Sequence, residues 1–351
     1  MENQHQPALE TTQANPLTSS VQKKEAPGGT TPPPFQLKAS EGFSPDGGPL
    51  QQSAAPEGPI QRLGRPSHPK EQVAGTCGLY SLAHSIAHLY GLDDANTASV
   101  RDLLLKAAGS VDKTVSAEGE ITSFSVAETI VTAYNKLTED YKISISQQTV
   151  DSGVTDEAGW RAALDINNGT SEGDDAATLA VDTGLYYDDF SEAEDKFDGS
   201  ADVTENGSKA KVVISTANVV TVTGLDAANA STKGDGAHWI NVTGVTSDYV
   251  EALDPNYPDF KFRFKVDEAA KLTTSFEAAT RGEYLDTVYE GKGKEADWVN
   301  DMGGGGNQDW QTMTGSSDAS TVKSTITDRL KNTDRTSAVS LNGLALKVTK
   351  A

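Results

Sequence analysis

One predicted helix, which begins at the only cysteine of the chain, limits the possible folds of this sequence more than any other stretch. Residues 75–91 read GTCGLYSLAHSIAHLYG, and Cys77 is the one cysteine among 351 residues. Apolar side chains recur after it at three- and four-residue steps, a spacing that predicts a helix with one buried face. Gly91 is a typical residue to follow a helix end. Cys77 therefore lies at or just before the first turn of a buried helix.

The position of Cys77 at a helix start has two interpretations. Unpaired N–H groups and the positive end of the helix dipole favour a thiolate there, which is one way in which proteins make a nucleophile. A free cysteine is otherwise a small, usually buried hydrophobic residue. A histidine and an acid that the fold brings to the cysteine would favour the first interpretation.

Both partners are present further along the chain. His238 precedes the strand-like run Trp239–Val245, and Asp254 follows the next apolar run, Tyr249–Leu253. A three-residue turn separates the runs, so they predict two adjacent antiparallel strands. The start of one strand and the end of its neighbour lie at the same end of a sheet, and His238 and Asp254 should meet there. A carboxylate that orients an imidazole beside a thiol is the arrangement that activates cysteine.

The type and order of these residues resemble papain-fold cysteine peptidases, and most closely the bacterial C39-like branch. The shared pattern is Cys-Gly opening a helix, His-aromatic in a strand and then Asp-Pro, here Cys77-Gly78, His238-Trp239 and Asp254-Pro255. Family members also carry a glutamine before the cysteine, whose amide helps to bind the oxyanion. Gln72 is the candidate, although it precedes Cys77 by five residues where six is usual. The resemblance covers about residues 70–272.

The resemblance implies an α+β, papain-like fold with a helical lobe and an antiparallel sheet lobe, and Cys77 and His238 would meet between the lobes. The residue patterns agree with this expectation. Helical spacing marks 99–108, 125–137 and 156–166, and alternation marks strands at 141–150, 211–225 and 260–266. The acidic stretch 171–206 is expected to form a loop.

Composition shifts predict three parts of the chain. Residues 1–66 form a Pro/Gly/Ser/Gln-rich leader that is expected to be disordered, because it has few apolar residues to bury. Residues 67–290 hold the peptidase-like domain. Residues 291–351 contain a Gly-rich linker, a helix and a strand. Three roles are open for this part: it adds to the sheet, it forms a lid, or it belongs to a domain that the chain does not complete.

The leader carries one patterned island, PPPFQLK at residues 32–38. This island resembles a segment at the start of proteins encoded with extracellular contractile injection systems, the phage-tail-like particles of bacteria. The resemblance implies a cargo or toxin that stays in the bacterial cytoplasm until it is loaded and is then delivered outside the cell or into a target cell. The alternative is a leader without an addressing role. The start of the chain also lacks the basic and apolar regions of a conventional secretory signal.

The net charge of −22 argues against nucleic-acid binding and against docking to anionic membranes. A single cysteine excludes an internal disulfide framework and a cysteine-rich zinc site. No apolar run approaches the length of a transmembrane helix. The two resemblances imply a protein or peptide substrate as the partner, and an injection-system particle as a second partner through the leader.

No metal or other cofactor is expected. His84 and His88 lie four residues apart on the first helix, but no third ligand of suitable spacing accompanies them. Residues 194–205 partly match a calcium-binding loop, with Gly199 at the sixth place and Glu205 at the twelfth. Lys196 occupies the third place, which requires an oxygen ligand, so a solvated acidic loop is the preferred interpretation.

The predicted chemistry is amide hydrolysis through a thioester. The Cys77 thiolate attacks a carbonyl carbon, His238 transfers the proton, Asp254 orients His238, and Gln72 with the Cys77 N–H stabilises the oxyanion. Two other interpretations remain open. The same triad serves transglutaminases, deamidases and peptide ligases, and the domain could also be a binding or structural cargo module without activity.

Overall fold

The computed structural model describes residues 76–166, 175–229, 237–273, 280–283, 299–300 and 303–351. Every described residue belongs to the compact unit Glu57–Ala351. The leader predicted for residues 1–66 lies outside the described residues, and so does Gln72.

The described strands form one nine-stranded sheet. Its order is β1 (Ile143–Thr149), β9 (Leu344–Lys350), β2 (Ala176–Asp182), β6 (Ala237–Val245), β7 (Tyr249–Leu253), β8 (Lys261–Lys265), β5 (Val219–Thr223), β4 (Lys211–Ile214) and β3 (Val203–Asn206). Neighbouring strands are antiparallel except β5 and β8, which pair in parallel. The predicted pair of strands after His238 is β6 and β7, in antiparallel register.

Helices accompany both faces of the sheet. The described α-helices are α1 (Cys77–Tyr90), α2 (Asp94–Ser110), α3 (Phe124–Tyr134), α4 (Glu157–Leu164), α5 (Tyr187–Glu194), α8 (Gln308–Thr314) and α9 (Ala319–Asn332). Short 3₁₀ turns occur at η1 (Thr183–Leu185), η2 (Ala227–Asn229), η3 (Ala269–Thr273) and η4 (Gly304–Gly306). These elements confirm the predicted α+β class.

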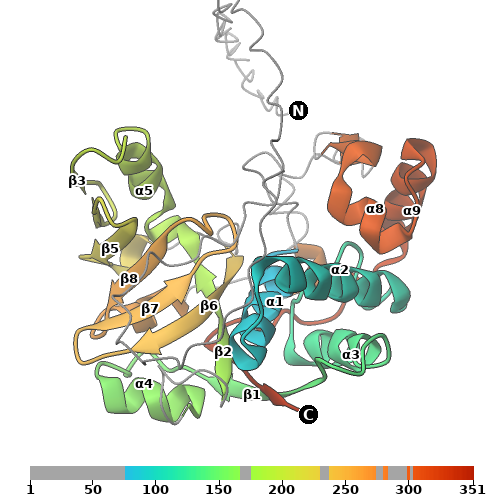
Figure 1. Ribbon diagram of the computed structural model, residues 1–351, viewed down its shortest axis with the longest axis horizontal. Coiled ribbons are helices and arrows are strands. Elements are labelled where there is room, and N and C mark those ends of the chain that lie inside the picture. Colours follow the sequence, from blue (N-terminus) through green and yellow to red (C-terminus); the bar gives the residue numbers. More distant parts are fainter. Residues whose placement is uncertain (1–75, 167–174, 230–236, 274–279, 284–298, 301–302) are drawn as a thin grey trace, which may run out of the picture. The chain divides into compact units, whose positions relative to one another are not determined.

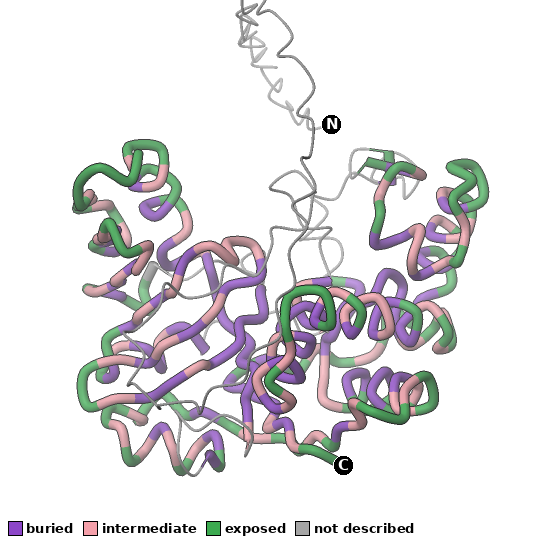
Figure 2. The backbone as a smooth tube through the Cα atoms, in the orientation of Figure 1, coloured by how far each residue is buried: buried purple, intermediate pink, exposed green. Residues whose placement is uncertain are grey.

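Helix α1 lies at the centre of this arrangement. It packs against β6 and β2 on one side and against α2 on the other, and Figure 1 shows it between the sheet and the α2–α3 pair. Leu79, Leu82 and Ile86 are completely buried, so the predicted apolar face of this helix is a core face. Figure 2 shows the same concentration of buried residues along α1 and the strands beside it.

Two apolar cores lie on opposite faces of the sheet. On β2, Ala176 and Ala180 join the core that also contains α1, α2, α3, α8 and α9, whereas Ala177 and Leu179 join the core that contains α4 and α5. Because both faces of β2 are covered, all seven of its residues are buried.

The C-terminal part contributes β9 to the interior of the sheet. This strand lies between β1 and β2 and pairs antiparallel with both. Of the possibilities left open for residues 291–351, the structure selects addition to the sheet. Helix α8 packs on α2 and also contacts α9, so these elements belong to the same compact unit as α1.

The expectation of a loop across 171–206 is wrong. Its described residues contain β2, α5 and β3. Strand β2 reads AATLAVD, an apolar run without alternation, because both of its faces are buried. The acidic residues of α5 lie mostly on its exposed side, while Phe190 and Ala193 face the core. The expected strand 211–225 is also divided into β4 and β5, because Asn218 adopts a left-handed turn conformation with φ of 58°.

Candidate active site

Cys77 is the first residue of α1 and is half-buried. The residue before it, Thr76, does not cap the helix with its side chain. Its hydroxyl instead donates to Asp309 Oδ2 of α8 over 3.2 Å, and the Tyr80 hydroxyl donates to Asp309 Oδ1 over 2.8 Å. Contacts from α8 therefore fix the start of α1, where the backbone N–H groups of the first turn have no helical acceptor.

The structure brings His238 and Asp254 together at the same end of the sheet. His238 is the second residue of β6, and Asp254 directly follows β7. The distance from His238 Nε2 to Asp254 Oδ1 is 2.8 Å, and both side chains are buried. The remaining ring nitrogen, Nδ1, is the one left for Cys77.

Cys77 is close enough to His238 to change the proton affinity of its ring. Burial on its own lowers the pKa of His238. The Asp254 carboxylate, Cys77 in its ionised form, and side-chain hydrogen bonds to both outweigh burial and raise the pKa to about 10. At neutral pH His238 is therefore an imidazolium that lies between a carboxylate and the Cys77 sulfur, an arrangement that can hold a thiolate.

Three residues that the sequence patterns did not single out hold Asp254, and the weakest contact is from the Tyr186 hydroxyl, which donates to Oδ2 over 3.5 Å. The Tyr187 hydroxyl donates to Asp254 Oδ2 over 2.5 Å, and the Asn256 N–H donates to Oδ1 over 2.8 Å. The Asn256 side-chain amide in turn donates to the Tyr187 hydroxyl over 3.1 Å. Burial and the Asp254 charge raise the pKa of Tyr187 well above its ordinary value, so Tyr187 remains a donor. These contacts leave the Asp254 carboxylate fixed against His238.

Replacing Tyr187 with phenylalanine is expected to slow alkylation of Cys77 at pH 7 roughly tenfold, because a hydrogen bond to a charged group contributes about 1.5–3 kcal/mol. The rate is measured with a neutral thiol reagent and intact-mass detection. Tyr257→Phe is the matched control, because its ring packs on Tyr187 but its hydroxyl binds Ser191. Equal rates for the two variants would show that Tyr187 does not act through Asp254.

The histidine pair on α1 offers no complete metal site among the described residues. They contain no group of three or more His, Cys, Asp or Glu side chains placed to hold an ion. Burial lowers the pKa of His84 to about 4, with opposing effects from Asp254 and Arg101, so its ring is neutral at neutral pH. The expectation that the protein uses no metal and no cofactor stays a prediction.

Side chains of the partial calcium motif already have partners within the loop. Lys196 forms an ion pair with Glu205, the residue at the twelfth place. Asp198 accepts hydrogen bonds from the backbone and side chain of Ser200. Because the carboxylates at both places have partners within the loop, the solvated-loop interpretation is the one that these contacts favour.

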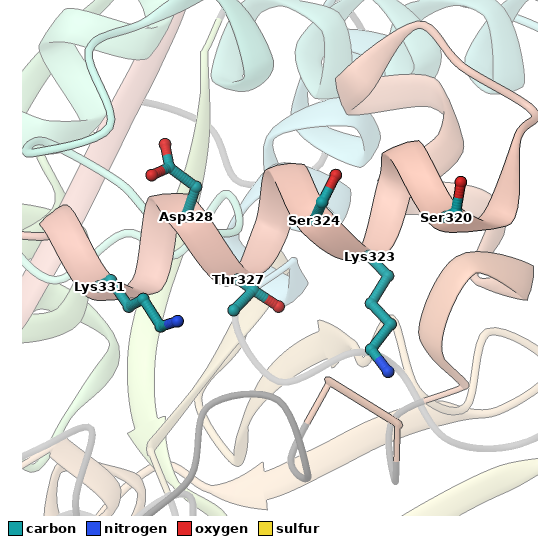
Figure 3. Close-up of a pocket in the computed structure, with 6 residues that line it drawn as sticks. All are labelled: Ser320, Lys323, Ser324, Thr327, Asp328 and Lys331. Carbon is teal, nitrogen blue, oxygen red and sulfur yellow. The ribbon is translucent and has the colours of Figure 1, made fainter.

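A surface hollow runs along α9, and none of the residues that line it belongs to the triad. Figure 3 shows its six residues, which all come from this helix: Ser320, Lys323, Ser324, Thr327, Asp328 and Lys331. None of them is a predicted site residue. A single exposed helix face does not enclose a ligand, so this hollow gives no second candidate site.

No described helix combines the length and apolar character that a membrane crossing requires. Comparison with protein families, with curated proteins and with solved structures found no match for this chain.

Proposed function

We propose that this protein is a cysteine-dependent hydrolase of amide bonds in proteins or peptides, with Cys77 as nucleophile, His238 as acid and base, and Asp254 as the orienting acid. One observation carries the proposal: the buried His238 ring binds Asp254 through Nε2 and lies close enough to Cys77 for that side chain to raise the pKa of the ring. The same observation argues against a domain in which the three residues are incidental, because that interpretation requires Cys77 and His238 to lie apart.

The reaction begins with attack of the Cys77 thiolate on the carbonyl carbon of the scissile amide. His238 then donates a proton to the leaving amine, and a thioester remains on Cys77. Water attacks the thioester while His238 accepts its proton, and the acid product leaves with the thiolate restored. Asp254 holds the imidazolium in place throughout. The Cys77 N–H and Gln72 are proposed to stabilise the oxyanion.

The proposed family is the C39-like branch of the papain-fold peptidases. Three features support it in addition to the residue order. A helix begins with the cysteine, that helix packs against the strand that carries the histidine, and the next antiparallel strand ends at the aspartate. The proposed division into a helical lobe and a sheet lobe has support from the packing of α1, α2 and α3 on one face of the sheet.

A transferase or deamidase that uses the same triad is the second candidate. The island at residues 32–38 supports the further proposal that the chain is a toxin or effector cargo of a bacterial contractile injection system. Such a cargo would be made in the bacterial cytoplasm, loaded through its leader, and delivered outside the cell or into a target cell.

The proposal predicts that Cys77 reacts rapidly with an electrophilic thiol probe at pH 6, where an ordinary cysteine, with a pKa of about 8.5, is almost entirely a thiol. The raised pKa of His238 means that its imidazolium is present in the folded protein from acidic pH up to about pH 10. His238→Ala should remove the fast reaction at pH 6. The measurement is intact-mass labelling from pH 5 to 9.

His88→Ala is the control for the labelling series, because it removes a histidine from the same helix that does not contact the triad. Slow labelling of the wild-type protein at pH 6 would contradict the proposal. An added primary amine then separates the two enzyme classes: a transferase incorporates the amine into the substrate, whereas a peptidase produces new N-termini.

A further inference from the structure

A second acidic residue lies in the loop that packs on the first turn of the Cys77 helix, and it has no role in the chemistry described above. Glu118 is completely buried, in the loop between α2 and α3. Neither of its carboxyl oxygens is exposed, and neither has a hydrogen-bond partner among the residues that the structure describes. A buried, unpartnered carboxyl group costs free energy, so its presence at this place calls for a physical account.

The loop that carries Glu118 packs on the first turn of α1. A Cβ atom added at Gly78 would lie 2.9 Å from the side chain of Ile121, and one added at Gly119 would lie 2.9 Å from the side chain of Leu79. On the other side, the Trp239 ring N–H donates to the Ile121 carbonyl over 3.1 Å. The loop is therefore fixed against the helix of Cys77 and against the strand of His238.

The positive charges near Glu118 are committed to other groups. Arg281 forms an ion pair with Glu120 and donates to the carbonyls of Thr114 and Val115. Arg329 of α9 donates to backbone carbonyls, including those of Ser116 and Ala117. Glu120 also accepts from the Ser116 hydroxyl and from the N–H groups of Ala117 and Glu118. Glu120 is thus the neutralised carboxylate of this loop, and Glu118 is not.

The charged groups around Glu118 act on its proton in opposite directions. Burial raises the pKa of Glu118 well above its ordinary value, Arg281 lowers it, and the negative charge of Cys77 raises it again. Two negative charges in one buried region repel each other. Ionisation of Cys77 therefore disfavours ionisation of Glu118, and ionisation of Glu118 disfavours the Cys77 thiolate.

We propose that Glu118 is a positioning residue of the Cys77 site, which remains an uncharged carboxylic acid so that the Cys77 thiolate has no second negative charge beside it. The inference rests on the proposed function, because it concerns the thiolate that this function requires. Loss of the Glu118 proton would favour transfer of the His238 proton to Cys77, which gives a neutral thiol and a neutral imidazole. Glu118 then sets an upper pH limit on the nucleophile.

The test uses linkage between pH and stability. A folded protein that keeps a proton on Glu118 binds more protons than the unfolded chain above the ordinary pKa of glutamate, so its stability falls as pH rises. Glutamine is neutral and of similar size, so the Glu118→Gln variant should not lose stability in this way as pH rises. We expect the unfolding midpoints of the variant and the wild type to separate increasingly between pH 5 and pH 8. Glu128→Gln, on the exposed face of α3, is the control and should show a constant difference.

The same comparison in a Cys77→Ala background tests the coupling to the thiolate. Without the thiolate, the separation should stop growing at a lower pH than it does with Cys77 present. Parallel curves for Glu118→Gln and wild type would overturn the proposal, and so would identical separations in the two backgrounds. Glu118→Met replaces Gln in this series if the amide prevents folding, since it also carries no charge.

The labelling series distinguishes failure of this inference from failure of the proposed function. If His238→Ala leaves Cys77 labelling unchanged, the proposed function fails, whatever the stability curves show. If labelling depends on His238 but the stability curves stay parallel, the function stands and the role of Glu118 does not.

Discussion

Replacing Cys77 with alanine is expected to reduce the rate of amide hydrolysis by a factor on the order of 10⁶. The remaining rate is that of the reaction in solution, increased only by the effect of substrate binding. The reason is that no covalent thioester can form, because His238 and its proton remain but the nucleophile beside them is gone. The measurement is the appearance of new N-termini in a peptide mixture, followed by mass spectrometry over a long incubation.

The control for this variant is its folding. Cys77 is only half-buried and Thr76 keeps its bond to Asp309, so Cys77→Ala should melt close to the wild-type temperature. Cys77→Ser is the more informative companion, because the serine hydroxyl has similar shape but does not form an anion beside the imidazolium. Undiminished cleavage by Cys77→Ala would assign the reaction to another residue or to a contaminating protease.

The parts of the site that the sequence predicted are those in which local patterns fix the geometry. The helix after Cys77 shows its apolar spacing directly, and the turn between β6 and β7 sets the register that places His238 near Asp254. Each relation involves few residues, so the pairing needs no knowledge of the rest of the fold. The fourth predicted residue, Gln72, lies outside the described residues, and its role stays a prediction.

Tyr187 and Glu118 could not be predicted in the same way. Tyr187 reaches Asp254 across 67 positions of sequence, from a helix inside a stretch that resembled an acidic loop. Glu118 lies in a short polar segment that packs against Met313 of α8 and is held by Arg281, both far along the chain. The only local signal was a pair of glutamates, Glu118 and Glu120, between apolar residues, and composition does not show which one is neutralised.

The position of β9 between β1 and β2 could not be predicted for the same reason. A strand from the C-terminal end pairs between β1 and β2, and such long-range pairing leaves no mark on the sequence beyond alternation. The alternating run near residue 345 therefore predicted a strand but gave no information about its neighbours. Because β2 is covered on both faces, its own sequence lacked alternation and resembled neither a surface strand nor a helix.

Replacing Arg281 with methionine is expected to lower the free energy of unfolding by about 3–5 kcal/mol, the usual effect of removing one partner from a buried ion pair. Arg281 is 1% exposed and Glu120 is equally buried, so the variant leaves an uncompensated carboxylate in the core. Two carbonyls of the loop, those of Thr114 and Val115, also lose their donor. Denaturant-induced unfolding at pH 7 measures the change.

Two further variants test the cause of this loss. Lys113→Met breaks the exposed ion pair with Asp328 and should leave stability almost unchanged, because water solvates both charges. The double variant Arg281→Met with Glu120→Gln removes the stranded charge and should recover part of the loss, which a double-mutant cycle measures. No recovery would show that the carbonyl contacts, and not the ion pair, stabilise the loop.

The position of this pair explains why the fold retains a costly buried charge. The Arg281–Glu120 pair fixes the loop that lies on the first turn of α1, and the same loop places Glu118 beside Cys77. Arg281 itself lowers the pKa of Glu118, so its loss alone keeps the carboxyl group protonated; ionisation at neutral pH requires the loop to move far enough for water to reach Glu118. Arg281→Met should therefore slow Cys77 alkylation as well as destabilise the protein, and addition of Glu118→Gln to this variant should restore the alkylation rate without restoring stability.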